Sequence, residues 1–274
     1  MGRKTRNILE REARPARDPF RFRRISVADK TRVAERFWRI RFSGTDLSDF
    51  DSPAFDNLVT LFFPDPKTGA PHLPEVTPAE VVWKDDARFY SREFTPLAFE
   101  GSGVMTLDVF SREGELDSDW AARALPGQEL VAGAPGESSV LSDEGRFQLY
   151  VCDESALPAF RRRQSAVKAG DWHLFAGIDE TAGRAYLGGL EDIDARWLGS
   201  AMLDADNLGM LIGALDKVSL PADDYLVWLA GEGETVALLS DYFTQRRGCD
   251  PACVHAVAYR RHRPLTAEPP LRRR

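Results

Sequence analysis

The stretch FQLYVC-DESALPA, residues 147–159, decides the fold class of the second half of this 274-residue chain. An apolar run of strand length is followed at once by a polar turn and the start of a helical pattern. The order returns in YLVWLA, residues 225–230, which precedes an amphipathic segment. By the same criteria we expect strands at 147–152, 171–176, 225–230 and 254–259, and helices at 154–164, 206–215 and 234–246. Alternating strands and helices indicate an α/β domain with a parallel sheet.

The first half of the chain is instead typical of an all-β domain. Short apolar segments are separated by clusters of Pro, Gly and Asp, which indicates an antiparallel β-barrel or sandwich. The expected strands cover residues 32–42, 57–63, 103–110 and 129–131, and a surface loop covers 65–78. Because the character changes near residue 142, we predict a barrel domain over 20–142 and an α/β domain over 143–264. Residues 1–19 and 265–274 are then a basic N-terminal tail and a flexible C-terminal tail.

The composition argues against several classes of function. The net charge of −7 does not suit a nucleic-acid binder, whose phosphate contacts need clustered positive charge. No apolar run is long enough to span a bilayer, and no apolar segment of a secretory leader follows the basic start. Three cysteines form no even disulfide framework, which favours a reducing compartment. We therefore expect a cytoplasmic protein without nucleic-acid or integral membrane contacts, and we take it to be a monomer.

Arginines crowd both ends of the chain. The N-terminal run extends to Arg21, Arg23 and Arg24, and two interpretations stay open for it: solvated chain ends, or a docking surface. Asp46 and Asp49, further along, are expected to be loop carboxylates. The paired cysteines near the end of the chain lack the spacing and the fourth ligand of a zinc site, so we predict no metal ligands.

The most informative segment of the first half is Arg88-Phe89-Tyr90-Ser91-Arg92. An arginine can form paired, charge-assisted hydrogen bonds to a pyrophosphate, and a tyrosine can stack on the face of a flavin ring. The serine hydroxyl can bond the ring near the atom that receives hydride. The alternative is an ordinary edge strand on which the tyrosine packs and the arginine is solvated.

Several motifs in a fixed order together resemble one family. They are R-x-Y-S at 88–91, P-G-x-x-L at 126–130, A-P-G-E-S at 134–138, D-E-S-A-L-P-A at 153–159, V-W-L-A-G-E at 227–232 and A-Y-R-R at 258–261. This order is similar to that of the siderophore-interacting proteins, which are FAD-dependent ferric-siderophore reductases with a ferredoxin-reductase-like fold. The resemblance extends from about residue 20 to about residue 263. It implies a flavin-binding β-barrel, an NAD(P)H-binding α/β domain, and electron transfer through FAD to a ferric siderophore or another ferric chelate.

The resemblance also implies site residues. Those expected to hold the flavin are Arg88, Phe89, Tyr90, Ser91, Asp108, Ser111, Ser118 and Trp120. Those expected to meet NADPH or NADH are Asp153, Glu154, Ser155, Ala156, Gly231 and Glu232. Those expected to attract the ferric chelate are Arg92, Arg260 and Arg261. No residue is expected to act as an acid or base, since the flavin carries the electrons.

Two of these positions have structural alternatives. Ser155 can cap the helix that follows it, which is a role of comparable weight to nucleotide binding. The segment Gly231-Glu232-Gly233 lacks the third glycine of a dinucleotide fingerprint, and a tight turn from strand to helix explains it as well. Arg184 and Arg196 are candidates for a contact with the 2′-phosphate of NADPH, and the choice between NADH and NADPH stays open.

The chain departs from the family pattern after residues 106–110. Ser111-Arg112 stands where the family has His-Gly, and residues 115–119, ELDSD, replace a Gly-Pro-Ala entry into the helix that begins near Trp120. Carboxylates suit a vacant helix N-terminus but repel the phosphates of a cofactor there. Either Ser118 or Arg112 then replaces the lost contact. Two alternatives follow: a flavin reductase with another acceptor, such as quinone, free flavin or a partner protein, or a non-catalytic member without FAD.

Overall fold

The computed structural model describes residues 21–50, 54–77, 81–84, 90–100, 103–133, 147–167, 170–188, 193–200 and 207–260. These residues divide into two compact units, one on each side of residue 139. The expected terminal tails, Arg88, Phe89, Arg261 and the A-P-G-E-S segment lie outside the described residues. Within the described part of the chain, no helix has the length and apolar character needed to cross a bilayer.

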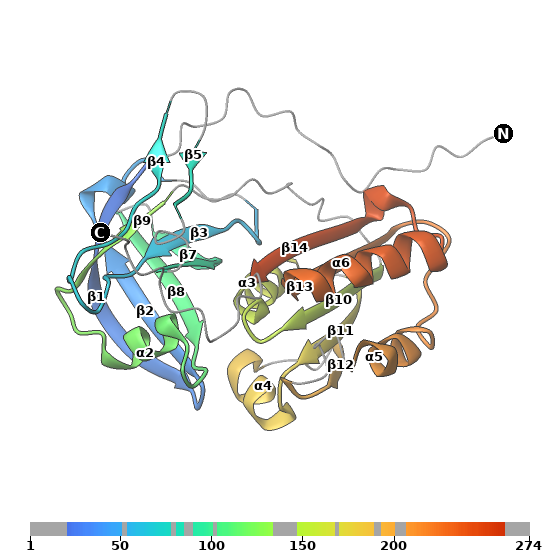
Figure 1. Ribbon diagram of the computed structural model, residues 1–274. Helices are drawn as coiled ribbons and strands as arrows, with labels where there is room; N and C mark the ends of the chain where they lie inside the picture. The colour runs from blue at the N-terminus through green and yellow to red at the C-terminus, as the bar shows by residue number, and fades with distance from the viewer. Residues whose placement is uncertain are drawn as a thin grey trace. The chain divides into compact units, whose positions relative to one another are not determined.

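The first unit is a curled antiparallel sheet of seven strands in the order β6-β3-β9-β1-β2-β8-β7 (Figure 1). The strands are β1 Arg23–Ala34, β2 Phe37–Ser43, β3 Val59–Phe62, β6 Ser91–Phe94, β7 Pro96–Glu100, β8 Val104–Phe110 and β9 Glu129–Ala132. The remaining elements are the 3-10 turn η1 Thr45–Leu47, the small pair β4 Glu75–Val76 and β5 Val81–Val82, and the helix α2 Leu116–Arg123. The predicted antiparallel β domain is confirmed.

The single strand predicted over residues 32–42 is wrong, because that segment contains a hairpin turn. Ala34 pairs with Phe37 across the turn, and β1 and β2 run antiparallel away from it. The guanidinium of Arg32 donates to the carbonyl oxygen of Glu35, which fixes the turn. Charged side chains interrupt the apolar pattern of β1, so the sequence predicts the first strand to begin at residue 32, whereas it begins at Arg23.

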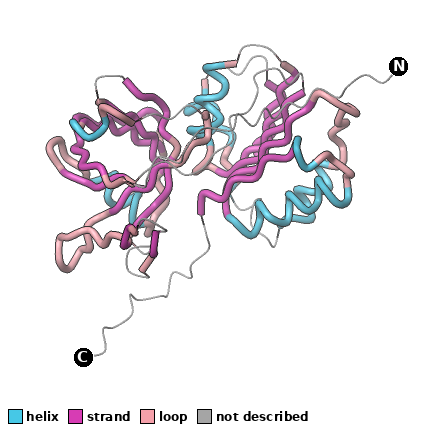
Figure 2. The backbone as a smooth tube through the Cα atoms, turned by 90° about the horizontal axis from the view of Figure 1, so that it is seen from above, coloured by secondary structure: helices cyan, strands magenta, loops and turns pink. Residues whose placement is uncertain are grey.

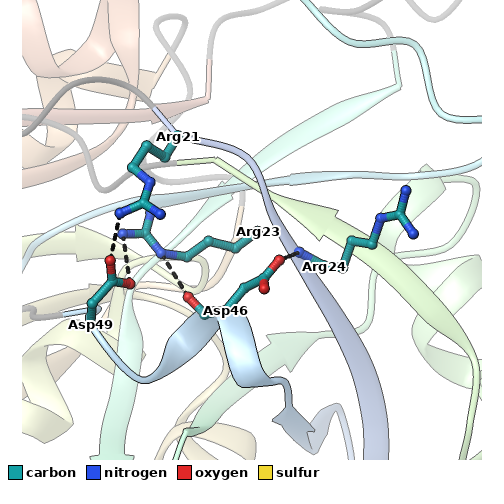
Figure 3. A network of polar contacts seen from close by, with 5 residues as sticks. All are labelled: Arg21, Arg23, Arg24, Asp46 and Asp49. Carbon is teal, nitrogen blue, oxygen red and sulfur yellow. Dashed lines mark hydrogen bonds and ion pairs between the residues drawn. The ribbon is translucent and has the colours of Figure 1, made fainter.

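The arginines at the start of β1 belong to the domain and are not solvated chain ends (Figure 3). The guanidinium of Arg21 donates to the Asp49 carboxylate at 2.5 Å, and that of Arg23 donates to the carbonyl oxygen of Asp46 at 3.1 Å. The carboxylate of Asp46 in turn accepts from the backbone N–H of Arg24 at 3.0 Å. Arg23 is 5% exposed, so these bonds fasten the first strand to the segment around η1.

Alternate residues of the strands point into one apolar core. Side chains such as Ile25, Ile40, Phe42 and Leu107 are 0–1% exposed, as expected for the inner face of a curled sheet. The helix α2 closes this core with Ala121 and Ala124. Its Trp120 packs parallel to Phe42, with ring centroids 6.2 Å apart, and meets Phe63 edge-on at 5.4 Å. The helix α2 is thereby held against the barrel.

The second unit is a parallel sheet of five strands in the order β12-β11-β10-β13-β14. Its strands are β10 Phe147–Asp153, β11 Asp171–Gly177, β12 Ile193–Trp197, β13 Tyr225–Glu232 and β14 Val254–Arg260. Its helices are α3 Leu157–Ala166, α4 Glu180–Leu187, α5 Leu208–Leu215 and α6 Gly233–Asp241; a π-helical turn, Tyr242–Arg246, continues α6, and the 3-10 turn Pro251–Cys253 precedes β14. Figure 2 shows helices on both faces of this sheet. The predicted α/β domain is confirmed, whereas the sequence patterns missed α4 and β12.

Each face of the parallel sheet has its own core. On one face, aliphatic residues of β10 and β13 pack against α5 and α6. On the other, the ring of Tyr150 lies parallel to that of Trp172 at 5.2 Å and edge-on to Phe160 of α3 at 4.9 Å. Burial on both faces explains why these strands are continuous apolar runs without alternation.

The contact between α4 and β12 generates a stability prediction. A Cβ at Gly183 of α4 would lie 2.1 Å from the Trp197 ring, so we expect Gly183→Ala to lower the free energy of unfolding by about 1–3 kcal/mol. Gly213 of α5 is the control, because nothing lies within 4 Å of its added Cβ. We expect Gly213→Ala to stabilise the protein by up to about 1 kcal/mol through helix propensity. Urea unfolding checks both; equal effects of the same sign would contradict the packing argument.

Candidate functional site

Two sequence motifs that are far apart in the chain meet at the carboxyl edge of the parallel sheet. The strands β10 and β13 are hydrogen-bonded neighbours, and Cys152 pairs with Ala230. The residues that follow, Asp153 and Gly231, therefore lie side by side. The strand order reverses between these same two strands, and open α/β sheets bind ligands at such switch points.

Asp153 organises the turn that leaves β10. Its carboxylate is 3% exposed and accepts the backbone N–H of Ser155 at 2.9 Å, together with the hydroxyl of the same residue. The helix α3 begins after Ala156, with no side-chain cap. The alternative that Ser155 caps the helix is therefore wrong, since its hydroxyl donates to Asp153 instead. Glu154 is 1% exposed and Ala156 is fully buried, so both are enclosed by this turn.

Gly231 is glycine for a geometric reason. Its φ is +153°, and an added Cβ would lie 3.0 Å from the carboxylate of Asp153. Glu232, the next residue, accepts hydrogen bonds from the backbone N–H groups of Glu234 and Thr235 and so caps α6. These bonds support the tight strand-to-helix turn, and a contact of Glu232 with a nucleotide stays a prediction.

The thiol of Cys152 is enclosed below this edge. It is fully buried, and burial, with the nearby charges of Asp153 and Glu154, raises its pKa well above the ordinary value. The protonated thiol is a packing group and not a nucleophile.

In the barrel, Tyr90 stands at the start of β6. The side chain is 5% exposed, and its backbone carbonyl accepts from the N–H of Phe63 at 2.7 Å. The imidazole of His72 lies parallel to the tyrosine ring, with centroids 5.1 Å apart and an angle of 18°. The Nε2 atom of His72 is 3.1 Å from the carboxylate of Asp65. His72 was missed because a loop rich in proline carries no periodicity that could single it out.

Asp65 anchors this arrangement. Hydrogen bonds from the backbone N–H of Lys67 and from His72 lower the pKa of Asp65 below its ordinary value. The carboxylate therefore stays ionised at neutral pH and fixes the imidazole that lies on the ring of Tyr90.

Arg92 lies beside the expected flavin residues but faces the acidic segment. Its guanidinium donates to the carbonyl oxygen of Ser91 at 2.8 Å. It also lies 3.5 Å from a carboxylate oxygen of Glu115 and 3.8 Å from one of Asp117. Arg92 thus connects the expected flavin-binding segment with the acidic segment 115–119, which are distant in the sequence.

The start of α2 is built by Ser118. Its hydroxyl donates to the carbonyl oxygen of Phe110 at 3.1 Å and accepts from the N–H of Arg112 at 2.8 Å. The hydroxyl hydrogen is thus used inside the chain, and Ser118 has at most an acceptor left for a ligand. In the described part of the chain, the buried indole N–H of Trp120 has no hydrogen-bond partner.

The groups around β6 and α2 fit a flavin. A tyrosine ring, a serine hydroxyl and an indole N–H that has no acceptor among the described residues suit a flat heterocycle with a polar rim. The donor at Trp120 is buried, so a small local rearrangement must accompany any contact with a ligand.

Two further predicted residues are engaged by arginines of β2 and the hairpin turn. Asp108, whose side chain is fully buried, receives both donors of Arg39, at 2.8 and 2.7 Å. The backbone N–H of Ser111 donates to the carbonyl oxygen of Arg36, whose guanidinium donates back to the Ser111 carbonyl at 3.0 Å. Asp108 and Ser111 therefore hold the end of β8 in place.

The remaining candidates lie on the second unit. Arg184 donates to Glu180 at 2.8 Å and lies over the ring of Trp197 at 5.9 Å. Arg196 lies 3.6 Å from a carboxylate oxygen of Asp194 and covers Phe175. Arg260 ends β14, beside Glu232 in the sheet register.

Comparison with known proteins defines the class and then the family. Phthalate dioxygenase reductase shares the fold, with a TM-score of 0.54, 12% identity, and coverage of 85% of this chain and 67% of that protein. A siderophore utilization protein from T. fusca has a TM-score of 0.73 and 24% identity, covering 89% of this chain and 94% of that one. The chain thus has the fold class of these two proteins, a curled antiparallel sheet followed by a parallel α/β sheet.

Sequence comparison narrows this class. Residues 26–139 match the siderophore-interacting FAD-binding domain, and residues 146–263 match the siderophore-interacting protein family. The NADPH-dependent ferric-chelate reductase of Escherichia coli is 35% identical over 260 residues, which cover 92% of this chain and 98% of that protein. The chain belongs to the siderophore-interacting protein family, as the motifs predicted.

The Arg39–Asp108 pair generates a second stability prediction. Asp108→Ala leaves a partly buried guanidinium without its main partner, so we expect a loss of about 2 kcal/mol in the free energy of unfolding. The exposed pair of Arg41 with Asp29, 2.8 Å apart on the same sheet, is the matched control. We expect Asp29→Ala to cost about 0–1 kcal/mol. Denaturant unfolding of both variants decides; an equal, small loss would refute the structural role of Asp108.

Gly231 generates a third prediction. Gly231→Ala adds a Cβ against Asp153 at a positive φ, so we expect a loss of about 2–3 kcal/mol in the free energy of unfolding. Gly199 also has a positive φ, but nothing lies within 4 Å of its added Cβ. Gly199→Ala should therefore cost only the backbone strain, about 1 kcal/mol. If both variants lose the same stability by urea titration, the contact with Asp153 is not what requires glycine.

Proposed function

We propose that this protein is an NADPH-dependent ferric-chelate reductase whose physiological substrates are ferric siderophores. The observation that carries the proposal is the 35% identity to the Escherichia coli enzyme of that activity over nearly the whole of both chains. A ferric vibriobactin reductase of Vibrio cholerae, 24% identical over 78% of this chain, supports the same class of substrate.

The barrel residues are assigned to the cofactor. FAD, when bound, supplies the redox chemistry: it takes a hydride from NADPH and passes the two electrons singly to ferric iron. Tyr90, backed by His72, offers its ring for stacking, and Ser91 offers a hydroxyl at the ring edge. Arg88 and Phe89, which precede them in the chain, complete this segment, and Arg88 binds the diphosphate. Trp120 donates its indole N–H.

The carboxyl edge of the parallel sheet is assigned to NADPH. The absence of a side chain at Gly231 lets its backbone lie close beside Asp153, which the hydrogen bonds from Ser155 hold in one orientation. Glu154 and Ala156 shape the same turn. Arg184 of α4, the helix that follows β11, is the residue we assign to the 2′-phosphate, and its partner Glu180 gives way to the ligand.

No side chain has to transfer a proton in the iron step. Fe(III) gains one electron and becomes Fe(II), which hard oxygen chelators bind more weakly, so the iron is released. Many ferric siderophores are anionic, and Arg260 and Arg261 are positioned in the sequence to attract them. Arg92 is withdrawn from this role in our proposal, because its charge faces Glu115 and Asp117.

We place the reaction in the cytoplasm. The three cysteines are free thiols, and NADPH is the reductant of that compartment. The monomeric state stays a prediction that sedimentation can check.

The proposal is tested by colour and by iron reduction. Purified protein should be yellow or become so with added FAD, and it should reduce ferric siderophores with NADPH, followed by a ferrous-specific chelator. Tyr90→Ala removes the stacking ring, so we expect about tenfold weaker FAD binding, whereas Tyr90→Phe should bind normally. A colourless protein that takes up no FAD would contradict the proposal. If quinone or free flavin is reduced faster than ferric chelates, the proposed electron acceptor is wrong.

A further inference from the structure

The acidic entry into α2 is matched by one arginine from the neighbouring strand. Glu115 and Asp117 lie on either side of the start of α2, and the Arg92 guanidinium lies 3.5 and 3.8 Å from their carboxylates. The three side chains are only 29%, 30% and 19% exposed, so water screens these charges incompletely. This is a partly buried charge cluster, unlike a solvated surface pair.

The other charges of this helix are matched elsewhere. Asp119 lies 3.8 Å from Arg123, one turn along α2, and both are well exposed. Of the acidic residues at the entry to α2, Glu115 and Asp117 are therefore the two that face Arg92. Burial raises the pKa of Asp117, the charge of Arg92 lowers it, and Glu115 raises it again. The ionisation of Asp117 thus depends on its arginine partner.

Arg92 also touches the flavin-binding segment itself. Its guanidinium donates to the carbonyl oxygen of Ser91, so one side chain joins the backbone of β6 to the start of α2. A helix N-terminus favours an anion, and the carboxylates of the chain compete for that place. A cofactor diphosphate beside this helix start meets two negative charges unless a positive charge offsets them.

We propose that Arg92 is a positioning residue for FAD: it offsets the charge of Glu115 and Asp117 and holds Ser91, so that a dianionic cofactor binds beside an acidic helix start. This inference rests on the proposed function. It gives the acidic segment 115–119, where the chain departs from the family pattern, a compensating positive charge within this chain.

The test is FAD binding to the apoprotein, followed by the quenching of flavin fluorescence. We expect Arg92→Met to weaken FAD binding about tenfold at low salt and less at 1 M salt, since repulsion between charges is screened. The triple variant Arg92→Met, Glu115→Gln, Asp117→Asn should bind FAD within about threefold of the wild type, because the repelling charges are gone too. Arg92→Lys keeps the charge and should lose less than Arg92→Met.

Two controls separate this role from a purely structural one. Arg123→Met removes an exposed arginine of the same helix and should leave FAD binding unchanged. Thermal unfolding of each apoprotein shows whether the barrel is intact. If Arg92→Met binds FAD as tightly as the wild type, or if its loss is independent of salt and is not restored in the triple variant, the inference is overturned while the proposed function stands. If the wild-type apoprotein takes up no FAD, both are overturned.

Discussion

The parallel pairing of β10 with β13 is the constraint on which the second unit depends. It brings the end of one motif, Asp153, against the end of another, Gly231, and it also creates the reversal of strand order at which open α/β sheets bind ligands. This one register places the buried carboxylate of Asp153 beside Gly231, the residue without a side chain. A shift of the pairing by one residue would turn every side chain of β13 to the opposite face of the sheet.

In the barrel, contacts between segments that are distant in the sequence constrain the fold. Ser118 fixes the loop between β8 and α2, Arg92 joins β6 to that loop, and Asp108 with Arg39 holds β8 against β2. Several of the polar residues that the family pattern singles out therefore make hydrogen bonds or ion pairs within the protein. Their conformations are set before a ligand arrives, which reduces the ordering that binding must accomplish.

The sequence predicts the class of each unit well and its details less well. The runs YLVWLA and FQLYVC identify buried parallel strands because both their faces are covered. The strand β1 escapes detection because it begins with arginines; Arg23 bonds the carbonyl oxygen of Asp46 and pairs with Asp49, and such contacts across a loop leave no trace in a local pattern. The partners of Arg92 and the place of His72 are missed for the same reason: contacts between distant segments are made by the fold.

The stack of His72 on Tyr90 has a consequence for the segment that carries the histidine. Tyr90 is 5% exposed and directly precedes β6, so the imidazole fastens the proline-rich segment after β3 to the segment that enters β6. The segment from residue 64 to residue 74 is thus packed against a buried aromatic ring, and the hydrogen bond between His72 and Asp65 holds it there. A substitution at His72 or Asp65 would therefore act on the antiparallel sheet, although both residues lie in a segment whose composition is typical of a solvated connection.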